Sequence, residues 1–189
     1  MKSSSPPRKI IGITGAFGSG KTTAAEYFKS KGYVIVTLSS SLEKEAMQRG
    51  LPLTRQNLQD LGNEMRKLYG AGILMKKALY QNNEQKIVVD GLRNLGEVEE
   101  LRQHAGSTLL AIVADRNIRF ERLKKLKRRE TLTQDLFNSL DLRDLGVNEK
   151  ITGLQTALCI ALADVYIDSN GTLEEFESDL EKFIKSYGK

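Results

Sequence analysis

Eight consecutive residues near the N-terminus have the types and spacing of a phosphate-binding loop. The run Gly15-Ala16-Phe17-Gly18-Ser19-Gly20-Lys21-Thr22 fits the pattern G-x-x-x-x-G-K-[ST]. Glycines let the backbone approach an anion without a Cβ in the way, and a following helix adds partial positive charge at its N-terminus. Lys21 can then reach the β- and γ-phosphates of a nucleotide, and the Thr22 hydroxyl can bind Mg²⁺. Thr23 completes the expected nucleotide contacts.

A second group that can do chemistry is Asp90-Gly91-Leu92-Arg93, which follows the apolar run Ile87-Val88-Val89. An apolar strand delivers Asp90 to its carboxyl end, where a carboxylate can hold Mg²⁺ or orient an acceptor. Arg93 can clamp a phosphate with two parallel hydrogen bonds. An ordinary strand end with an Asp turn is the alternative, and the phosphate-binding loop favours the functional interpretation.

The residues around the loop predict the elements that position it. Ile10-Ile11-Gly12-Ile13 reads as a buried strand, and residues 22–30 read as a helix that ends at Lys31-Gly32. Residues 33–38 form a second apolar run, so one βαβ unit and a parallel sheet are expected. Further strands are predicted over residues 87–90, 108–114 and 164–168. The apolar stretch 157–163 predicts a buried helix, and residues 173–187 a final helix capped by Thr172.

Residues 42–81 are predicted to be helical, with Thr54 as the N-cap of the middle helix. An excursion of this length beside the phosphate loop predicts an acceptor-binding region over about residues 39–81. Its charged candidates are Arg49, Arg55, Arg66 and Lys67. The run Ser39-Ser40-Ser41 either caps the first of these helices or lies near the phosphates beyond the strand end.

The positive charge of the chain is concentrated in one segment. The net charge is +5, and residues 116–130 contain eight basic and two acidic residues, so the rest of the chain is nearly neutral. Two helices joined by a basic turn predict a lid over about residues 116–146, with Arg122, Arg128, Arg129 and Arg143 as candidates for transition-state charge. Nucleic acid could also attract such a segment, but it carries few aromatic side chains for stacking.

Composition limits the remaining classes of protein. Cys159 is the only cysteine, so no internal disulfide can form and a reducing, cytoplasmic setting is expected. No apolar run approaches the ~18 residues of a membrane span. Residues 1–9 predict a short disordered tail, and residues 10–189 a single α/β domain. The predicted architecture is the three-layer P-loop fold with a parallel five-stranded sheet, a helical acceptor region and a lid.

The chain resembles the P-loop kinases of small metabolites, the nucleoside monophosphate kinases and dephospho-CoA kinases. Asp90-Gly91-Leu92-Arg93 is similar to the D-G-x-P-R segment of adenylate kinases without its proline. Residues 164–171 are similar to the closing A-D-x-x-I-x-N-x-G segment of dephospho-CoA kinases, which implies that Asn170 and Gly171 lie near the nucleotide base. The runs 54–64 and 141–146 resemble archaeal kinase-like proteins and kinase-like domains found beside deoxycytidylate deaminase domains. Dephospho-CoA kinases carry an aspartate where this chain has Ser39 to Ser41.

These features together predict an enzyme that binds ATP and Mg²⁺ and transfers the γ-phosphoryl group to a small phosphorylated acceptor, a nucleoside monophosphate. Lys21 and the loop amides would hold the phosphates, Thr22 and Asp90 the metal, and Arg93 the acceptor phosphate. Two alternatives stay open. One is a nucleotide-dependent switch or ATPase whose basic segment binds a macromolecule, possibly nucleic acid. The other is a kinase-like protein that binds nucleotides without catalysis.

Overall fold

The computed structural model describes residues 8–126 and 132–187. Its centre is one sheet of five parallel strands in the order β2-β3-β1-β4-β5. The strands are β1 (Lys9–Thr14), β2 (Val34–Thr37), β3 (Lys86–Asp90), β4 (Ser107–Val113) and β5 (Val165–Asp168). The predicted parallel five-stranded sheet is therefore confirmed. The tail predicted over residues 1–9 lies outside the described residues up to position 7, and β1 begins at Lys9.

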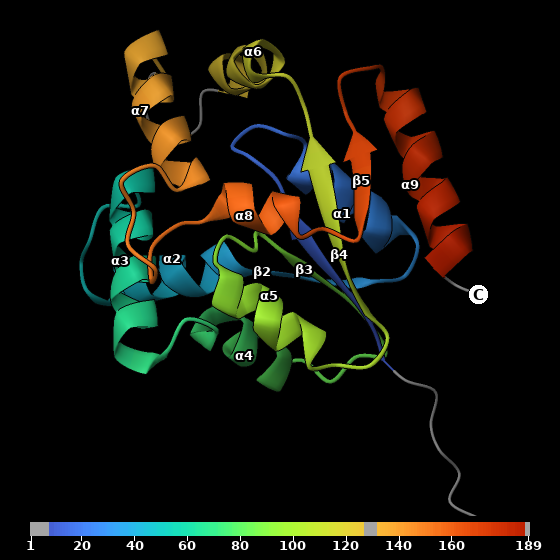
Figure 1. Ribbon diagram of the computed structural model, residues 1–189, viewed down its shortest axis with the longest axis horizontal. Helices are drawn as coiled ribbons and strands as arrows, with labels where there is room; N and C mark the ends of the chain where they lie inside the picture. The colour runs from blue at the N-terminus through green and yellow to red at the C-terminus, as the bar shows by residue number, and fades with distance from the viewer. Residues whose placement is uncertain (1–7, 127–131, 188–189) are drawn as a thin grey trace, which may run out of the picture.

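Helices cover both faces of the sheet, as Figure 1 shows. On one face lie α1 (Lys21–Ser30) and α9 (Leu173–Tyr187). The other face carries α5 (Leu95–Arg102) and the short α8 (Thr156–Ala161), with α2 (Leu38–Gln48), α3 (Arg55–Tyr69) and α4 (Ile73–Tyr80) packed beside them. Thr54 and Thr172 cap α3 and α9, as predicted: their hydroxyls accept bonds from Asn57 N and Glu175 N.

The central strand β1 is buried on both sides, which accounts for its continuous apolar sequence. Ile10 packs into the core under α2–α5, whereas Ile11 and Ile13 pack against α1 and α9. Because successive side chains of a strand point to opposite faces, one short run of isoleucines joins both cores. The backbone leaving β1 is consequently held firmly where the phosphate-binding loop begins.

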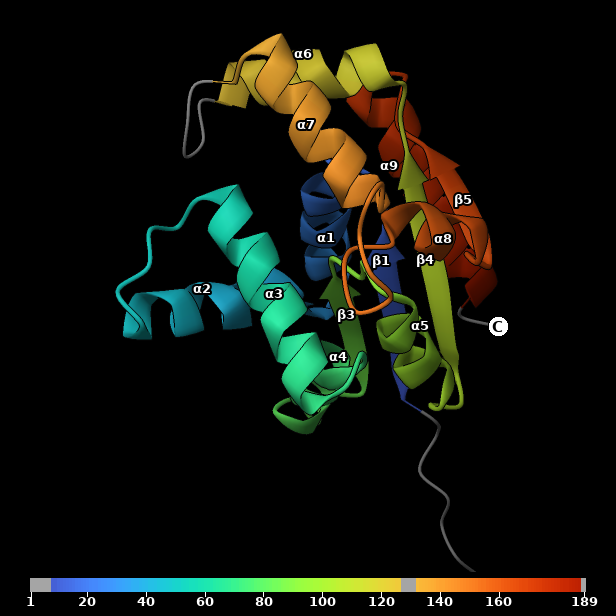
Figure 2. The same ribbon diagram turned by 60° about the vertical axis from the view of Figure 1, so that its left-hand side comes forward.

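The register of the strands brings their carboxyl ends to one edge. Asp90 is level with Ile13 on β1 and with Thr37 on β2, and Thr14 is level with Ala111 on β4. Figure 2 shows α6 (Arg116–Leu126) and α7 (Gln134–Leu145) lying beyond this edge. Ligands in open α/β sheets bind at such an edge, so the fold places the candidate residues together.

The serine run does not cap a helix, which corrects one of the two interpretations of residues 39–41. Helix α2 begins earlier, at Leu38, and all three serines lie inside its first turn. The hydroxyl of Ser40 donates back to the Thr37 carbonyl oxygen at 2.7 Å. A serine that bonds to a carbonyl one turn earlier stays within a helix instead of starting one.

Two predictions of burial were wrong. The apolar stretch 157–163 forms only the short helix α8, which buries Thr156 and Cys159 and leaves Leu158 and Leu162 half-exposed. Strand β2 lies at the edge of the sheet and is not fully buried. An apolar run shows that a segment has something to bury, but neighbouring elements decide which of its side chains are covered.

Candidate active site

The loop between β1 and α1 has the geometry that an anion-binding turn requires. Gly15, Gly18 and Gly20 all have positive φ, at 146°, 84° and 100°. Residues other than glycine rarely adopt such φ angles, and a Cβ at Gly15 would also collide with the Ile112 carbonyl oxygen of β4. Gly20 stands at the N-cap position of α1, so the loop amides and the helix N-terminus lie together.

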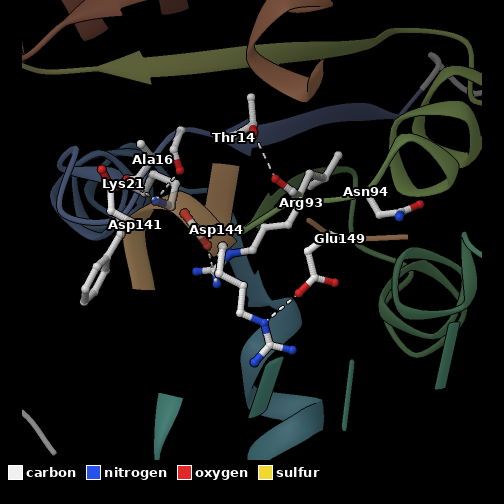
Figure 3. A network of polar contacts seen from close by, with 12 residues as sticks. Thr14, Ala16, Lys21, Arg93, Asn94, Asp141, Asp144 and Glu149 are labelled. Carbon is white, nitrogen blue, oxygen red and sulfur yellow. Dashed lines mark hydrogen bonds and ion pairs between the residues drawn. The ribbon is translucent and has the colours of Figure 1, made fainter. Parts of the chain in front are cut away.

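Lys21 is buried at the start of α1. Its Nζ donates to the carbonyl oxygens of Gly15 and Ala16 at 2.7 and 3.0 Å, as Figure 3 shows. Burial, followed by the positive charge of Arg93, lowers the pKa of Lys21 to about 8. A partly desolvated ammonium held against the loop is well placed to bind an anionic phosphate. The next two residues, Thr22 and Thr23, are exposed in the first turn.

Asp90 ends β3 beside this lysine. The carboxylate is 7% exposed, and its Oδ1 has no hydrogen-bond partner among the described residues. Burial raises the pKa of Asp90, while Lys21 and Arg93 act in the opposite direction. A buried carboxylate oxygen with spare capacity and the exposed Thr22 hydroxyl are oxygen ligands of the kind that Mg²⁺ prefers. The residues present therefore fit a metal at this position.

Arg93 lies in the turn after β3 and points back toward the loop. Its Nη1 lies 3.1 Å from Oδ1 of Asp144, a residue in the last turn of α7. The Arg93 backbone is fixed separately, because its N–H donates to Glu97 at 2.7 Å and its carbonyl accepts from Gln155 N. The guanidinium is thus presented at the strand edge from a rigid turn.

Asp144 was missing from the site predicted by the sequence. It is 0% exposed and lies between Lys21 and Arg93 (Figure 3). Burial opposes its ionisation, but Arg93, Arg55 and Lys21 outweigh burial and hold the pKa of Asp144 below its usual range. The run 141–146, which resembles archaeal kinase-like proteins, is a signal for this segment, but it does not indicate which of its residues faces the loop.

Helix α6 is fastened to the phosphate-binding loop by its arginines. Arg119 donates to the Phe17 carbonyl oxygen at 3.0 Å and also bonds to the buried Asp141 of α7. Arg116 reaches the same carboxylate at 3.2 Å. The predicted lid segment therefore packs onto the loop, and Asp141 ties its two helices to each other.

A hollow of about 220 Å³ lies between the phosphate-binding loop and the turn after β5. Gly20, Thr23, Arg122, Ser169 and Gly171 contribute to its lining. Arg122 donates to the Ser169 hydroxyl at 3.0 Å, and that hydroxyl donates to the Ser19 carbonyl oxygen at 2.7 Å. A concave site beside a helix N-terminus suits the sugar and base of a bound nucleotide.

The other residues predicted to contact the nucleotide lie in different places. Among the described residues, Asn170 is not part of the lining of the hollow. Its amide instead joins the turns after β4 and β5 by bonds with Asp115 and Asp168. Arg143 makes ion pairs with Asp60 of α3 and with Glu149. Arg128 and Arg129 lie outside the described residues.

The charged candidates of the acceptor region have different surroundings. Arg55 places its guanidinium 3.3 Å from the ring centre of Phe17, so α3 reaches the loop through a cation–π contact. Arg66 is buried and paired with Glu97 at 2.8 Å, which makes it a structural residue. Arg49 pairs at the surface with Glu45 and Glu64, and Lys67 is exposed. Only Arg55 of these four acts on the phosphate loop.

Two further observations concern the described part of the chain. No helix there is long and apolar enough to cross a membrane. Among the same residues, no group of three or more His, Cys, Asp or Glu side chains is placed to hold a metal. A metal bound by Thr22 and Asp90 would accordingly depend on a nucleotide for further ligands.

Comparison with known proteins places this geometry among related chains. Residues 11–142 match the family described as AAA domain. A UPF0200 protein of Sulfurisphaera tokodaii is 34% identical over 179 residues, which cover 94% of this chain and 96% of that one. A UPF0200 protein of Methanocaldococcus jannaschii is 31% identical over 182 residues, covering 93% and 89%.

Solved structures share the fold at low sequence identity. Shikimate kinase from Acinetobacter baumannii, in complex with shikimate, has a TM-score of 0.61 at 14% identity, covering 95% of this chain and 94% of that one. The protein TT1252 from Thermus thermophilus also has a TM-score of 0.61, at 21% identity, covering 96% and 98%. A gluconokinase from Sinorhizobium meliloti has a TM-score of 0.53 at 17% identity, covering 95% of each chain. The fold is that of the P-loop kinases.

Proposed function

Because this chain belongs to the AAA domain family and to the UPF0200 proteins, and has a P-loop kinase fold, we propose that it is a nucleotide kinase. It transfers the γ-phosphoryl group of ATP to a small phosphorylated acceptor, a nucleoside monophosphate. The observation that carries this proposal is the meeting of Lys21, Asp90 and Arg93 at one edge of the sheet. Lys21 and Arg93 both act on the pKa of Asp90, so the three groups share one electrostatic site.

Each of these groups has a role in the proposed transfer. The loop amides and Lys21 bind the β- and γ-phosphates of ATP, and Arg93 clamps the phosphate of the acceptor. An acceptor oxygen forms a bond to the γ-phosphorus while the bond to the β-phosphate oxygen breaks, and ADP leaves. Because positioning dominates this chemistry, the rigid turn around Arg93 is as important as its charge.

A magnesium ion would be held by Thr22 and Asp90, and it would neutralise charge on the transferred phosphoryl group. Asp90 in that case orients the metal or the acceptor. Its raised pKa matches a carboxylate that gains a cation when the reactants bind. The hollow beside Arg122 and Gly171 receives the sugar and base of ATP, where the resemblance to dephospho-CoA kinases puts the base.

The helices α6 and α7 act as the lid in this scheme. They exclude water, which competes with the acceptor for the phosphoryl group, and α6 contributes Arg122 beside the loop. Arg128, Arg129 and Arg143 remain proposed lid residues. A cytoplasmic setting, where ATP is plentiful, agrees with the single buried free thiol of Cys159.

The test is ADP production from Mg-ATP with and without a panel of acceptors. The panel holds the ribo- and deoxyribonucleoside monophosphates and dephospho-CoA. We expect one acceptor to stimulate ADP production strongly and to appear as a phosphorylated product. In that reaction Asp90→Asn lowers kcat at least about 100-fold, on the scale of other removed transition-state contacts. Asp164→Asn, at the amino end of β5, is the matched control and leaves kcat unchanged.

A second candidate function is a nucleotide-dependent switch or ATPase with a macromolecular partner. The exposed Lys124 and Lys125 on α6 favour it, because they add positive charge beyond that of Arg119 and Arg122, which contact the loop and the turn after β5. Slow ADP release that no acceptor stimulates would support this alternative. A nucleic-acid partner would then reveal itself by an affinity that falls steeply with salt.

A further inference from the structure

We propose that Asp144 is a positioning residue whose carboxylate occupies the anion site of Arg93 and is exchanged there for the phosphate of the acceptor. The inference rests on the proposed function, which assigns Arg93 to that phosphate. It adds a residue from α7 to the acceptor site and makes acceptor binding depend on the position of the lid.

Two buried carboxylates on α7 differ in their surroundings. Asp141 and Asp144 are both 0% exposed. Asp141 accepts hydrogen bonds from Arg119 and Arg116. Asp144 lies 3.1 Å from Arg93 Nη1 and is stabilised by the backbone N–H of Phe17, but no described side chain makes a well-formed hydrogen bond to its oxygens. Buried carboxylates normally accept several such bonds from side chains, so Asp144 is held mainly by charge.

Positive charges surround Asp144. Three cations act on it, and each comes from a different element: Arg93 from the turn after β3, Arg55 from α3 and Lys21 from α1. They keep it ionised despite its burial, whereas burial raises the pKa of the neighbouring Asp90. Cations that converge from separate elements on one buried point form a phosphate-binding arrangement. Asp144 supplies the negative charge at that point.

The acceptor phosphate and Asp144 compete for Arg93. An acceptor phosphate at the guanidinium brings up to about two negative charges next to a buried carboxylate, and like charges in a poorly solvated site repel strongly. Arg93 cannot hold both anions in the same geometry. Binding of the phosphate therefore displaces Asp144 and with it the last turn of α7.

The displacement reaches the acceptor region through the adjacent residue. Arg143 pairs with Asp60 of α3 and with Glu149, and Asn63 of α3 donates to the same Glu149 at 2.7 Å. A shift of the α7 C-terminus consequently acts on α3, which also carries Arg55 at the loop. Acceptor binding and lid packing are thus coupled through a contiguous set of ion pairs.

The experiment measures binding of inorganic phosphate by calorimetry, with a non-hydrolysable ATP analogue and Mg²⁺ present to occupy the phosphate loop. The full chain is compared with three variants. Asp144→Asn removes the competing charge, and we expect phosphate to bind roughly tenfold tighter, within the usual range of coupling between sites. Asp144→Glu retains the charge and should bind phosphate as the original chain does. Asp141→Asn is the matched control on the same helix and should give no gain.

Equal or weaker phosphate binding by Asp144→Asn would overturn the proposal, because a purely structural residue or a direct acceptor ligand predicts that result. The double variant Asp144→Asn/Arg93→Ala must lose the gain, and a gain that persists also overturns it. Amide hydrogen exchange over residues 141–146 requires no variant. Phosphate should accelerate this exchange in the original chain, and an unchanged rate contradicts displacement.

Failure of this inference and failure of the proposed function give different results. Phosphate binding needs no phosphoryl transfer, so a gain in Asp144→Asn without any active acceptor leaves the exchange at Arg93 standing and removes the kinase. An active acceptor with no effect of Asp144→Asn on phosphate affinity leaves the kinase standing and removes the exchange. With an active acceptor in hand, Asp144→Asn lowers its KM about tenfold without raising kcat, a split that a general loss of stability does not produce.

Discussion

The hydroxyl of Ser169 donates to the carbonyl oxygen of Ser19 at 2.7 Å, and it accepts a bond from Arg122 at 3.0 Å. One buried hydroxyl thereby joins the turn after β5, the phosphate-binding loop and helix α6. These segments are far apart in the sequence, and each would contact a different part of a bound nucleotide.

Ser169→Ala should destabilise the protein by about 1–2 kcal/mol, because it leaves the buried Ser19 carbonyl without its donor. Urea unfolding measures the change. The matched control is Ser30→Ala, since Ser30 is exposed at the end of α1 and its hydroxyl bonds only within that helix. Equal effects of the two substitutions would contradict a special role for Ser169.

Lys21 should give the stability of the protein a distinctive pH dependence. The pKa of Lys21 is about 8 in the folded protein and takes its ordinary value of 10.5 in the unfolded chain. Between these two pH values the unfolded chain therefore binds more protons than the folded protein does. Stability attributable to Lys21 therefore rises with pH over that interval, as the buried ammonium loses its charge. Relative to Lys21→Met, the free energy of unfolding should rise by about 3 kcal/mol from pH 7 to pH 10.5.

Urea denaturation of both proteins without nucleotide, at several pH values, tests this expectation. The other ionisable groups are the same in both proteins, so their contributions cancel in the difference. If the difference in unfolding free energy between the two proteins stays constant from pH 7 to pH 10.5, burial does not lower the pKa of Lys21.

Two arginines of the predicted acceptor region should behave in opposite ways. Arg66→Met leaves the carboxylate of Glu97 buried without its partner, and such a loss typically costs about 3–5 kcal/mol. Glu97 also accepts the backbone N–H groups of Arg93 and Asn94, so the turn that presents Arg93 should loosen as well. Arg49→Met breaks only surface pairs and should leave the denaturation midpoint almost unchanged. A small effect of Arg66→Met would show that Glu97 is held by other donors.

Comparing alanine substitutions at Gly18 and Gly32 distinguishes the effect of backbone strain from the effect of contact with α6. Both have positive φ, at 84° and 82°, so alanine costs about 1–2 kcal/mol at either position. At Gly18 the new Cβ would also lie 2.8 Å from Leu123 Cδ1 and 2.9 Å from the Arg119 carbonyl oxygen, whereas Gly32 has open space around it. Gly18→Ala should therefore displace α6 and weaken binding of Mg-ADP, which calorimetry measures. Gly32→Ala should leave nucleotide affinity intact, and equal affinities of the two variants would exclude a functional contact with α6.

Much of the fold could be predicted because its signals are local. The glycines of residues 15–20 specify their own backbone angles, and the apolar runs at residues 10–13 and 87–89 specify strands. Strand order along the chain then leaves few parallel topologies, since crossovers are short and right-handed. Thr54 and Thr172 cap helices with bonds three residues away, which is again a local effect.

The failures concern residues whose environment is created by distant segments. The apolar sequence of α8 does not show that only Thr156 and Cys159 would be buried. Ser40 of α2 bonds back to the Thr37 carbonyl oxygen because β2 ends at Thr37, one residue before the predicted end. Nothing in the local sequence distinguishes Asp144 from other aspartates on helices, because its contact with Arg93 forms only when α7 packs at the carboxyl edge of the sheet.

The sequence by itself determined the phosphate-binding loop, the parallel sheet and the delivery of Asp90 to a strand end, because backbone conformation and the strand period depend on neighbouring residues. Tertiary structure alone decided which charges meet. Arg66 became structural through Glu97, Arg55 reached Phe17, and Asp144 came to Arg93 from a separate helix. Electrostatic interaction in a protein depends on distance and burial, and both are set only when segments remote in the chain pack against each other.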